Sequence, residues 1–554
     1  MRNLFGILFF IYNDHGQHRL LQYTTNRNLD QRILPSFNLP LSFNPFLFKT
    51  AMTLWSQPQP QPQPQPQSQP QPGNLFNKLT SLLLLGLFLL VVSSEVIESK
   101  FLIKTLPGLS GELNVSLETG YIGVGESDDV QLFYYFVESE GSPDNDPIMF
   151  MLSGGPGCSG LTKIVSNTGP FNFNYANSTP ENPVLEINSY SWTKVANIIS
   201  IDQPAGTGFS YAKYPKAYIT NDTLSSMLCY QFLRKWLDDH PRFIKNPLYV
   251  GADSYGGLFV PLIVQQIYKG NEVGEEPHIN IKGYVIGNPV TDTSAEYNFR
   301  IPSAHHLALL SDAVYKSAKR NCRGEYLNVD SNNILCIHDL NVVEKCLKRI
   351  QMEYILDPYC GPSNTFKPSL FKRDLRSIEK TSKDIWSLHQ VQMEGCNDDI
   401  HMYPYVWANR RDVREALHIR EVFNETEWVL CNGSLQFFYN QEPISYTHNI
   451  WSTVAYHRHL ANKNCRALVY SGDQDMIVSY LSTLNWIKSL NLLLKNDWGP
   501  WFVDEQVAGY TMKYSHNDYN LTFATVKGGG HTATDYKPKE CLKMLMKWFS
   551  NDAL

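Results

Sequence analysis

Five short apolar runs, each ending at a turn that contains glycine, aspartate or asparagine, constrain the fold of this chain more than any other feature. They are PIMFMLSGG (147–155), VANIISIDQP (195–204), PLYVGADSYGG (247–257), IKGYVIGNP (281–289) and RALVYSGDQD (466–475). Because these runs are apolar throughout, we expect strands that are buried on both faces. Helical patterns such as LSSMLCYQFLRKWLDDHP lie between several of them. This alternation predicts an α/β fold, with a mostly parallel central sheet and helices on both faces.

The first 94 residues are expected to be a leader that lies outside this fold. Residues 57–72 are a Gln-Pro repeat, which cannot build a core. The apolar run Leu82–Val92 follows Lys78 and is short for a bilayer span, so it predicts a signal peptide. A retained signal anchor remains the alternative. Residues 1–51 precede these signals and are expected to be an extension or an unusual leader.

The remaining sequence is expected to form one core with an insertion. Strand-like runs and helical patterns occupy 95–294 and 441–554, and these two segments are expected to build the core. Residues 295–440 are rich in cysteine and irregular loops, so they are expected to form an inserted cap.

Composition excludes one class of function and favours one cellular route. The chain of 554 residues has a net charge of −6, so no basic surface for nucleic acid is expected. All ten cysteines lie beyond residue 150 without a C-x-x-C pair, which favours disulfides over a zinc or redox motif. Together with N-glycosylation sequons, this predicts a secreted or vacuolar glycoprotein. The six sequon asparagines are Asn114, Asn177, Asn221, Asn424, Asn432 and Asn520.

The segment GADSYGG offers a candidate nucleophile. Ser254 follows a strand-like run and precedes a helical one, with small residues at Ala252 and Gly256. This spacing is typical of the nucleophile elbow of α/β hydrolases, in which a serine occupies a tight strand-to-helix turn. By itself the motif is weak, because an ordinary turn serine has the same surroundings.

Two further strand ends supply the partners that a nucleophilic serine needs. Asp475 ends the run RALVYSGDQD, and His531 follows FATVKGGG. The chain order of serine, aspartate and histidine is that of the α/β-hydrolase triad. An oxyanion hole is expected from the backbone N–H groups of Gly155, in the glycine-rich loop SGGPG, and Tyr255, the residue after the nucleophile.

These motifs together resemble the serine carboxypeptidase-like family. The resemblance rests on GGPGCS, the D-S-Y-x-G elbow, GDxD and GGGH, and it extends from about Phe101 to Trp548. It implies an α/β-hydrolase core with a cap, a catalytic triad of Ser254, Asp475 and His531, and no metal or cofactor. In GDQD it assigns the catalytic role to the second acid and a structural role to Asp473.

The resemblance also implies a set of disulfides. The implied pairs are Cys158–Cys431, Cys322–Cys336 and Cys360–Cys396. Four cysteines then have no assigned partner and are expected to be buried free thiols. These four are Cys229, Cys346, Cys465 and Cys541.

Departures from the peptidase pattern indicate the reaction. In the peptidases the loop typically reads NGGPGCSS and the elbow GESY, and the Asn and Glu bind the free carboxylate of a peptide. Here Ser153 and Asp253 occupy those positions. Asp is one methylene shorter than Glu, and Ser lacks the second polar arm of Asn, so both changes weaken such a site. Ser153, Gly154 and Asp253 are the residues expected to contact the substrate.

SGGPGCS with DSY instead resembles the plant serine carboxypeptidase-like acyltransferases of secondary metabolism. That branch implies transfer of an acyl group from a 1-O-acyl-glucose ester to an alcohol-type acceptor. A serine carboxypeptidase acting on peptide C-termini is the first alternative. A non-catalytic binding glycoprotein on the same fold is the second. No membrane partner is expected for the mature form unless the apolar leader segment is retained.

Overall fold

The computed structural model describes residues 100–554 except 167, 180, 360–398, 421–425 and 437–445. The described residues belong to one compact unit, Glu95–Leu554. The predicted leader, residues 1–94, lies outside the described residues, as does the predicted disulfide Cys360–Cys396. Among the described helices, none is both long enough and apolar enough to cross a membrane.

The strands of the structure include all five apolar runs of the sequence. In chain order they are β1 (Lys100–Ile103), β2 (Leu117–Val124), β3 (Val130–Val137), β4 (Ile148–Leu152), β5 (Phe171–Phe173), β6 (Leu185–Ile187), β7 (Asn197–Ile201), β8 (Tyr211–Ala212), β9 (Thr220–Asn221), β10 (Leu248–Asp253), β11 (Ile281–Gly287), β12 (Tyr446–Thr447), β13 (Arg466–Gly472), β14 (Leu493–Val503), β15 (Gln506–His516) and β16 (Tyr519–Val526).

Helices lie between strands of the core along the chain and also within the predicted cap, residues 295–440. They are α3 (Asp222–Asp239), α4 (Gly256–Glu272), α5 (Thr293–His306), α6 (Asp312–Cys322), α7 (Ile334–Leu347), α9 (Asp399–Asn409), α10 (Arg411–Ala416), α11 (Gly433–Gln436), α12 (Val454–Leu460), α13 (Tyr480–Ser489), α14 (Ala533–Tyr536) and α15 (Pro538–Phe549). The short 3-10 helices are η1 (Glu126–Asp128), η2 (Gly160–Lys163), η3 (Trp192–Lys194), η4 (Pro215–Tyr218) and η5 (Pro241–Phe243).

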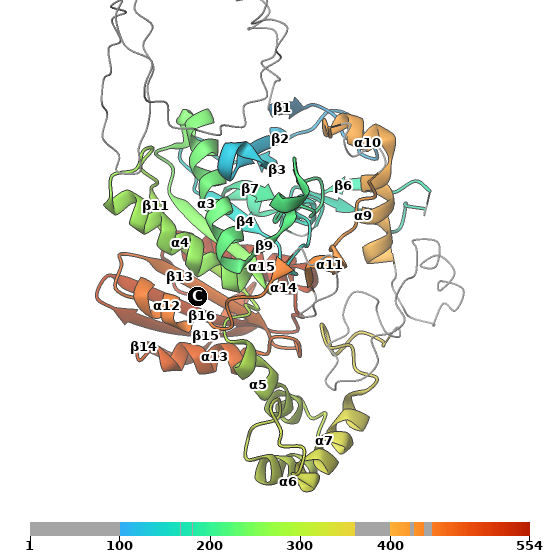
Figure 1. Ribbon diagram of the computed structural model, residues 1–554, viewed down its shortest axis with the longest axis vertical. Coiled ribbons are helices and arrows are strands. Elements are labelled where there is room, and N and C mark those ends of the chain that lie inside the picture. Colours follow the sequence, from blue (N-terminus) through green and yellow to red (C-terminus); the bar gives the residue numbers. More distant parts are fainter. Residues whose placement is uncertain (1–99, 167, 180, 360–398, 421–425, 437–445) are drawn as a thin grey trace, which may run out of the picture. The chain divides into compact units, whose positions relative to one another are not determined.

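A 12-stranded sheet forms the centre of the unit, in the order β1-β2-β3-β7-β4-β10-β11-β13-β16-β15-β14, with β8 beside β3 (Figure 1). The α/β fold is confirmed, but the parallel arrangement is confined to the six central strands from β7 to β16. The flanking strands pair antiparallel, and short turns join β2 to β3, β14 to β15 and β15 to β16. One such turn is Asp504-Glu505, in which both residues have positive φ.

Both faces of the central strands are buried, as the apolar runs predict. On β10, Leu248 and Val250 belong to the hydrophobic cluster that contains α3 and α4. Tyr249, between them, belongs to the cluster on the opposite face, which contains α15. Since the central strands are parallel, their carboxyl ends meet at one edge, and the loops that follow them gather there.

The predicted cap, residues 295–440, contributes to two different parts of the structure. Helices α5–α7 form a hydrophobic cluster with Met476 from the loop after β13. By contrast, α9 and α10 bury Trp407 and Val413 with side chains of β2 and β3. In Figure 1, α9 and α10 lie near the β1–β3 end, whereas α5–α7 project at the bottom of the view. The apolar faces of α9 and α10 explain why they join the outer strands.

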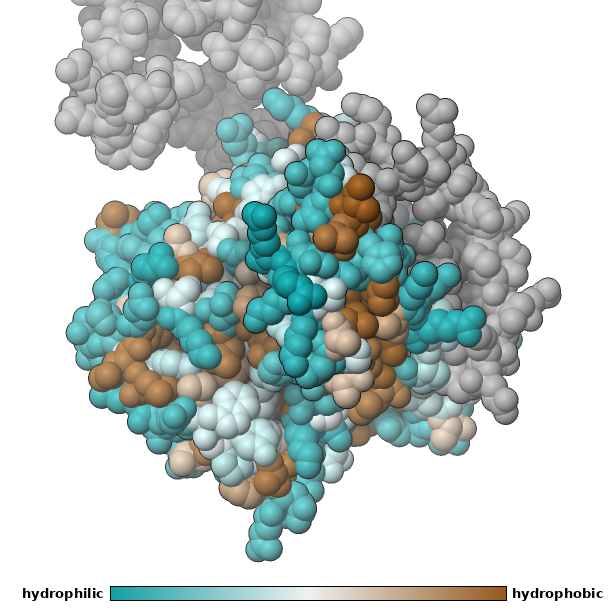
Figure 2. All heavy atoms as spheres, turned by 90° about the horizontal axis from the view of Figure 1, so that it is seen from below, coloured by the Kyte–Doolittle hydropathy of each residue, from teal (hydrophilic) through white to brown (hydrophobic). Residues whose placement is uncertain are grey.

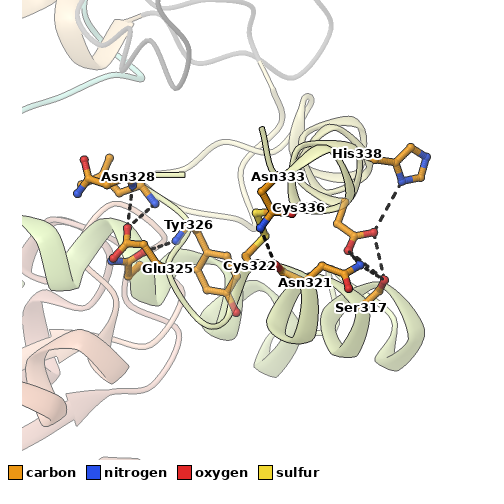
Figure 3. The surroundings of a disulfide bond; sticks show 12 residues. Ser317, Asn321, Cys322, Glu325, Tyr326, Asn328, Asn333, Cys336 and His338 are labelled. Atoms are coloured by element: carbon orange, nitrogen blue, oxygen red, sulfur yellow. Dashed lines mark hydrogen bonds and ion pairs between the residues drawn. A yellow bond between two sulfur atoms is a disulfide. The ribbon is translucent and has the colours of Figure 1, made fainter. Parts of the chain in front are cut away.

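A disulfide and a polar network hold α6 against α7 (Figure 3). Cys322 at the end of α6 is bonded to Cys336 in the first turn of α7. Asn333 caps α7 by accepting a hydrogen bond from the Cys336 N–H, and its amide donates to the Asn321 carbonyl. Asp339 accepts hydrogen bonds from Ser317 and Asn321. The two helices are therefore fixed as one hairpin.

The surface around this hairpin is mixed in character. Figure 2 views that end of the molecule and shows hydrophobic side chains interspersed with hydrophilic ones.

Cys346, on α7, is exposed, so the expectation that it is a buried thiol is wrong. Its neighbour Val343, by contrast, is buried in the cluster that α7 forms with α6. The other three free cysteines, Cys229, Cys465 and Cys541, are buried as expected.

Candidate active site

Ser254, His531 and Asp475 form one hydrogen-bonded chain at the carboxyl edge of the central strands. His531 Nε2 lies 2.8 Å from Ser254 Oγ, and His531 Nδ1 lies 2.8 Å from Asp475 Oδ2. Asp475 is buried, and only about a tenth of the His531 side chain is exposed. With Nδ1–H donating to Asp475, Nε2 is free to accept the serine proton.

The backbone around Ser254 has the geometry of a nucleophile elbow. Ser254 lies between β10 and α4 with φ of 54°, a left-handed conformation that costs free energy for a non-glycine residue. Its N–H donates to the Gly287 carbonyl at 3.0 Å. A Cβ on Gly256 would lie 2.4 Å from the Ala252 Cβ. Alanine is therefore tolerated at 252 because residue 256 is glycine.

Asp475 is held by more partners than the sequence indicates. Asn288 follows β11 and donates its side-chain amide to Asp475 Oδ2 at 2.7 Å. The backbone N–H of Ile477 donates to Oδ1 at 2.7 Å. Asn288 is fully buried and has φ of 41°, a strained conformation. It lies in the run IKGYVIGNP, and its place at a central strand end is the signal that could have identified it.

Asp473 has a different environment, in agreement with the structural role expected for it. Its Oδ1 accepts hydrogen bonds from the Gly528 N–H and from the Gln474 side chain, both at 2.8 Å. Asp473 thereby links the loop after β13 to the loop that carries His531.

Several charged groups act on the pKa of His531. Burial lowers this pKa, whereas the carboxylates of Asp475, Glu353 and Asp253 raise it, and the result is about 9. The backbone carbonyl of Glu353 also accepts a hydrogen bond from the backbone N–H of His531, at 2.7 Å. The protonated imidazole is therefore favoured at neutral pH, and the neutral base forms as the pH rises.

Replacing Glu353 with glutamine is expected to shift the acid limb of the kcat/KM profile to lower pH, by roughly half a unit. The variant removes a charge that raises the pKa of His531 but keeps the backbone hydrogen bond. The limb is measured with a p-nitrophenyl ester from pH 4 to 10. Glu505→Gln in the β14–β15 turn is the control and should leave the limb in place. A limb that stays fixed or moves to higher pH in Glu353→Gln contradicts this account.

The glycine-rich loop after β4 lies against the nucleophile. A Cβ on Gly154 would lie 2.7 Å from the Ser254 Cβ, so only glycine allows this approach. Within the described part of the chain, the N–H groups of Gly155 and Tyr255 donate no hydrogen bond. The Tyr255 hydroxyl donates to Asp222 at 2.6 Å, which fixes the residue at the start of α4. These two N–H groups suit an oxyanion hole.

A disulfide and a buried carboxylate support the same loop. Cys158 is bonded to Cys431, as the family resemblance implies, and the neighbouring Ser159 N–H donates to the Leu430 carbonyl. Asp202 accepts hydrogen bonds from the Ser159 hydroxyl at 2.6 Å and the Gly160 N–H at 2.7 Å. Burial raises the pKa of Asp202 to about 6, although these hydrogen bonds lower it. The loop is thus fixed from two sides.

The two remaining predicted substrate contacts are both engaged with the segment around η2. The Ser153 hydroxyl donates to the Ser159 carbonyl at 3.1 Å and lies 3.3 Å from the Thr162 hydroxyl. Asp253 forms an ion pair with Lys163, the last residue of η2. Nothing in the sequence pattern marks Lys163 as a partner of residue 253, since 90 residues separate them.

The sequon asparagines differ in their surroundings. Asn114, Asn177 and Asn520 are exposed. Asn221 caps α3, and Asn432 donates its amide to the Gly206 carbonyl at 2.8 Å. Asn424 lies outside the described residues. The three exposed asparagines are the ones open to a glycosylating enzyme, although the Asn520 amide donates to the Asp518 carbonyl at 3.3 Å.

Comparison with known proteins places most of the described unit in a single family. Residues 107–551 match the family model for serine carboxypeptidase. Serine carboxypeptidase-like 17 of Arabidopsis thaliana is 42% identical over 471 residues, which are 85% of this chain and 98% of that protein. Serine carboxypeptidase-like 10 of the same plant is 42% identical over 468 residues, which are 84% of this chain and 98% of that protein.

A solved structure has the same fold. It is KEX1(DELTA)P, a prohormone-processing carboxypeptidase from Saccharomyces cerevisiae, with a TM-score of 0.63 and 20% sequence identity. The likeness covers 82% of this chain and 96% of that chain. At this identity the comparison shows a common α/β-hydrolase fold.

Proposed function

The chain belongs to the serine carboxypeptidase family of Ser-His-Asp enzymes, and from this premise we propose that it is an acyltransferase. Its donor is a 1-O-acyl-glucose ester, and its acceptor is an alcohol-type molecule. Ser254 carries the acyl group between them. The proposed setting is the secretory route of a plant cell, ending in the apoplast or the vacuole. Two disulfides and three exposed sequon asparagines support that route.

The proposed reaction has two halves that use the same groups. Neutral His531 takes the Ser254 proton, and Ser254 Oγ attacks the ester carbonyl. The N–H groups of Gly155 and Tyr255 bind the oxyanion. His531 then gives its proton to the departing sugar oxygen. In the second half His531 removes the acceptor hydroxyl proton, and the acceptor oxygen attacks the acyl-enzyme. The resulting tetrahedral intermediate collapses, and Ser254 Oγ leaves and regains a proton from His531.

The observation that carries this proposal is the engagement of Ser153 and Asp253 within the protein. A peptidase of this type must bind the free carboxylate of a peptide. Here the Ser153 hydroxyl is hydrogen-bonded to its own loop, and Asp253 is paired with a buried lysine. With these groups engaged inside the protein, fewer polar groups are left to bind a peptide carboxylate at this place. A neutral ester donor does not need that recognition.

The test is a panel assay of the mature chain, expressed from about Glu95 in a secretory host. Three separate assays use acyl-glucoses with alcohol acceptors, acyl-glucoses with water alone, and blocked dipeptides. Ester formation well above hydrolysis supports the proposal. Dipeptide cleavage without transfer overturns it in favour of a carboxypeptidase. Inertness in all three assays, with no labelling by a fluorophosphonate, overturns it in favour of a binding glycoprotein.

A further inference from the structure

Lys163 and Asp253 form a buried ion pair with unused hydrogen-bonding capacity. The Lys163 ammonium contacts Asp253 Oδ2, and their side chains are only 8% and 13% exposed. Among the described residues, each is the other's sole side-chain partner. An ammonium has three N–H donors and a carboxylate has two acceptor oxygens, so within the described part of the chain donors on Lys163 and one oxygen of Asp253 have no side-chain partner.

The pair lies beside the proposed nucleophile. Asp253 directly precedes Ser254 at the end of β10. Its carboxylate acts on His531, whose pKa it helps to raise. Lys163 ends η2, and the preceding Thr162 lies against Ser153 in the glycine-rich loop. Groups from the elbow, the glycine-rich loop and η2 therefore border the same part of the site.

The charges of the pair favour one class of ligand. Together Lys163 and Asp253 carry no net charge. A hydroxyl group can accept from the ammonium and donate to the carboxylate, so a polyol satisfies the unused groups without adding charge. A carboxylate ligand would be attracted by Lys163 and repelled by Asp253, and it would leave the three groups with a net negative charge in a buried place. The pair thus favours neutral, hydroxyl-bearing groups.

We propose that Lys163 is a specificity-determining residue, which with Asp253 binds the neutral polyol part of the donor ester and disfavours an anionic group there. This inference rests on the proposed function, since it names the part of the site that receives the sugar. The ion pair acts on binding of the leaving group, while the triad acts on the ester carbonyl. Two donors that share the acyl group but differ in the leaving group therefore distinguish the role of the ion pair from that of the triad.

The experiment compares Lys163→Met with the wild type on two donors of the same acyl group, a 1-O-acyl-glucose and a p-nitrophenyl ester. We expect kcat/KM for the acyl-glucose to fall about 10- to 100-fold, mainly through KM, because the ammonium that donates to the sugar hydroxyls is removed. The value for the nitrophenyl ester should change less than about threefold, since that leaving group carries no hydroxyls. Lys194→Met, which breaks the more exposed ion pair with Glu140, is the matched control and should affect neither donor.

Two results overturn the inference. Equal loss on both donors assigns Lys163 a structural role, and no loss on either donor removes it from specificity. If Lys163→Met does not fold, as judged by its thermal transition, Lys163→Gln replaces it. The shorter amide keeps a donor without the charge, so a smaller loss on the acyl-glucose is expected.

Failure of the proposed function gives a different pattern. A wild type that ignores acyl-glucoses but cleaves blocked dipeptides contradicts acyl transfer. In that case the inference predicts that a dipeptide amide is preferred over the dipeptide acid, and that Lys163→Met strengthens this preference, because Asp253 loses its neutralising charge. A wild-type preference for the acid then overturns the role of Lys163 as well.

Discussion

Replacing Ser254 with alanine is expected to reduce acyl transfer by about 10⁴-fold or more, with little change in stability. The variant removes the atom that attacks the ester and that carries the acyl group. Ser254 also has positive φ, which alanine accepts at a similar cost, so the elbow should keep its shape. Initial rates of ester formation and fluorophosphonate labelling measure the loss.

His531→Ala added to Ser254→Ala should cause almost no further loss, since the two residues act as one unit. Ser489→Ala on α13 is the matched control, since the Ser489 hydroxyl donates to the Trp486 carbonyl, and this variant should keep full activity. Retention of more than about a hundredth of the wild-type rate in Ser254→Ala would assign the nucleophile to another residue.

Removing the disulfide Cys158–Cys431 is expected to destabilise the protein more than removing Cys322–Cys336. The first closes a loop over a sequence separation of 273 residues and the second over 14. On the chain-entropy account these correspond to about 5.6 and about 3 kcal/mol of unfolding free energy. Thermal unfolding of the two paired Cys→Ser variants measures the difference.

The same pair of variants separates stability from function. Cys158 lies in the loop that carries Gly155, so its removal should also lower transfer at temperatures where the variant remains folded. Cys322 and Cys336 join α6 to α7, away from the loop, and their removal should leave transfer within about twofold. A reversed order of stability, or full activity without Cys158–Cys431, would contradict this account.

The strands and the members of the triad could be predicted because each depends on a short stretch of sequence. An apolar run followed by a turn is a local pattern, and Ser254, Asp475 and His531 each follow one. The convergence of parallel strand ends at one edge then requires these residues to be near one another. The disulfides Cys158–Cys431 and Cys322–Cys336 were implied by resemblance to a family, since spacing alone does not determine pairing.

Other features depend on contacts between distant segments. Lys163 is an unremarkable lysine in the sequence, and its pairing with Asp253 depends on how η2 lies against the end of β10. Glu353 reaches His531 because residues 352–355 pass beside the loops after β13 and β16, where Met352 and Ile355 also bond to the backbone. The division of the predicted cap between two hydrophobic clusters has the same origin.

The sequence by itself determined the α/β fold, the family and the three residues of the candidate triad, because local patterns of burial and turn formation encode them. Only the tertiary structure decided how the polar groups beside Ser254 are paired. Ser153 and Asp253 were recognised as substitutions, but their partners lie on η2. The effect of a buried charge on a ligand depends on the group that neutralises it, and the group that neutralises Asp253 is distant in the sequence. The chemistry of that part of the site therefore follows only from the tertiary structure.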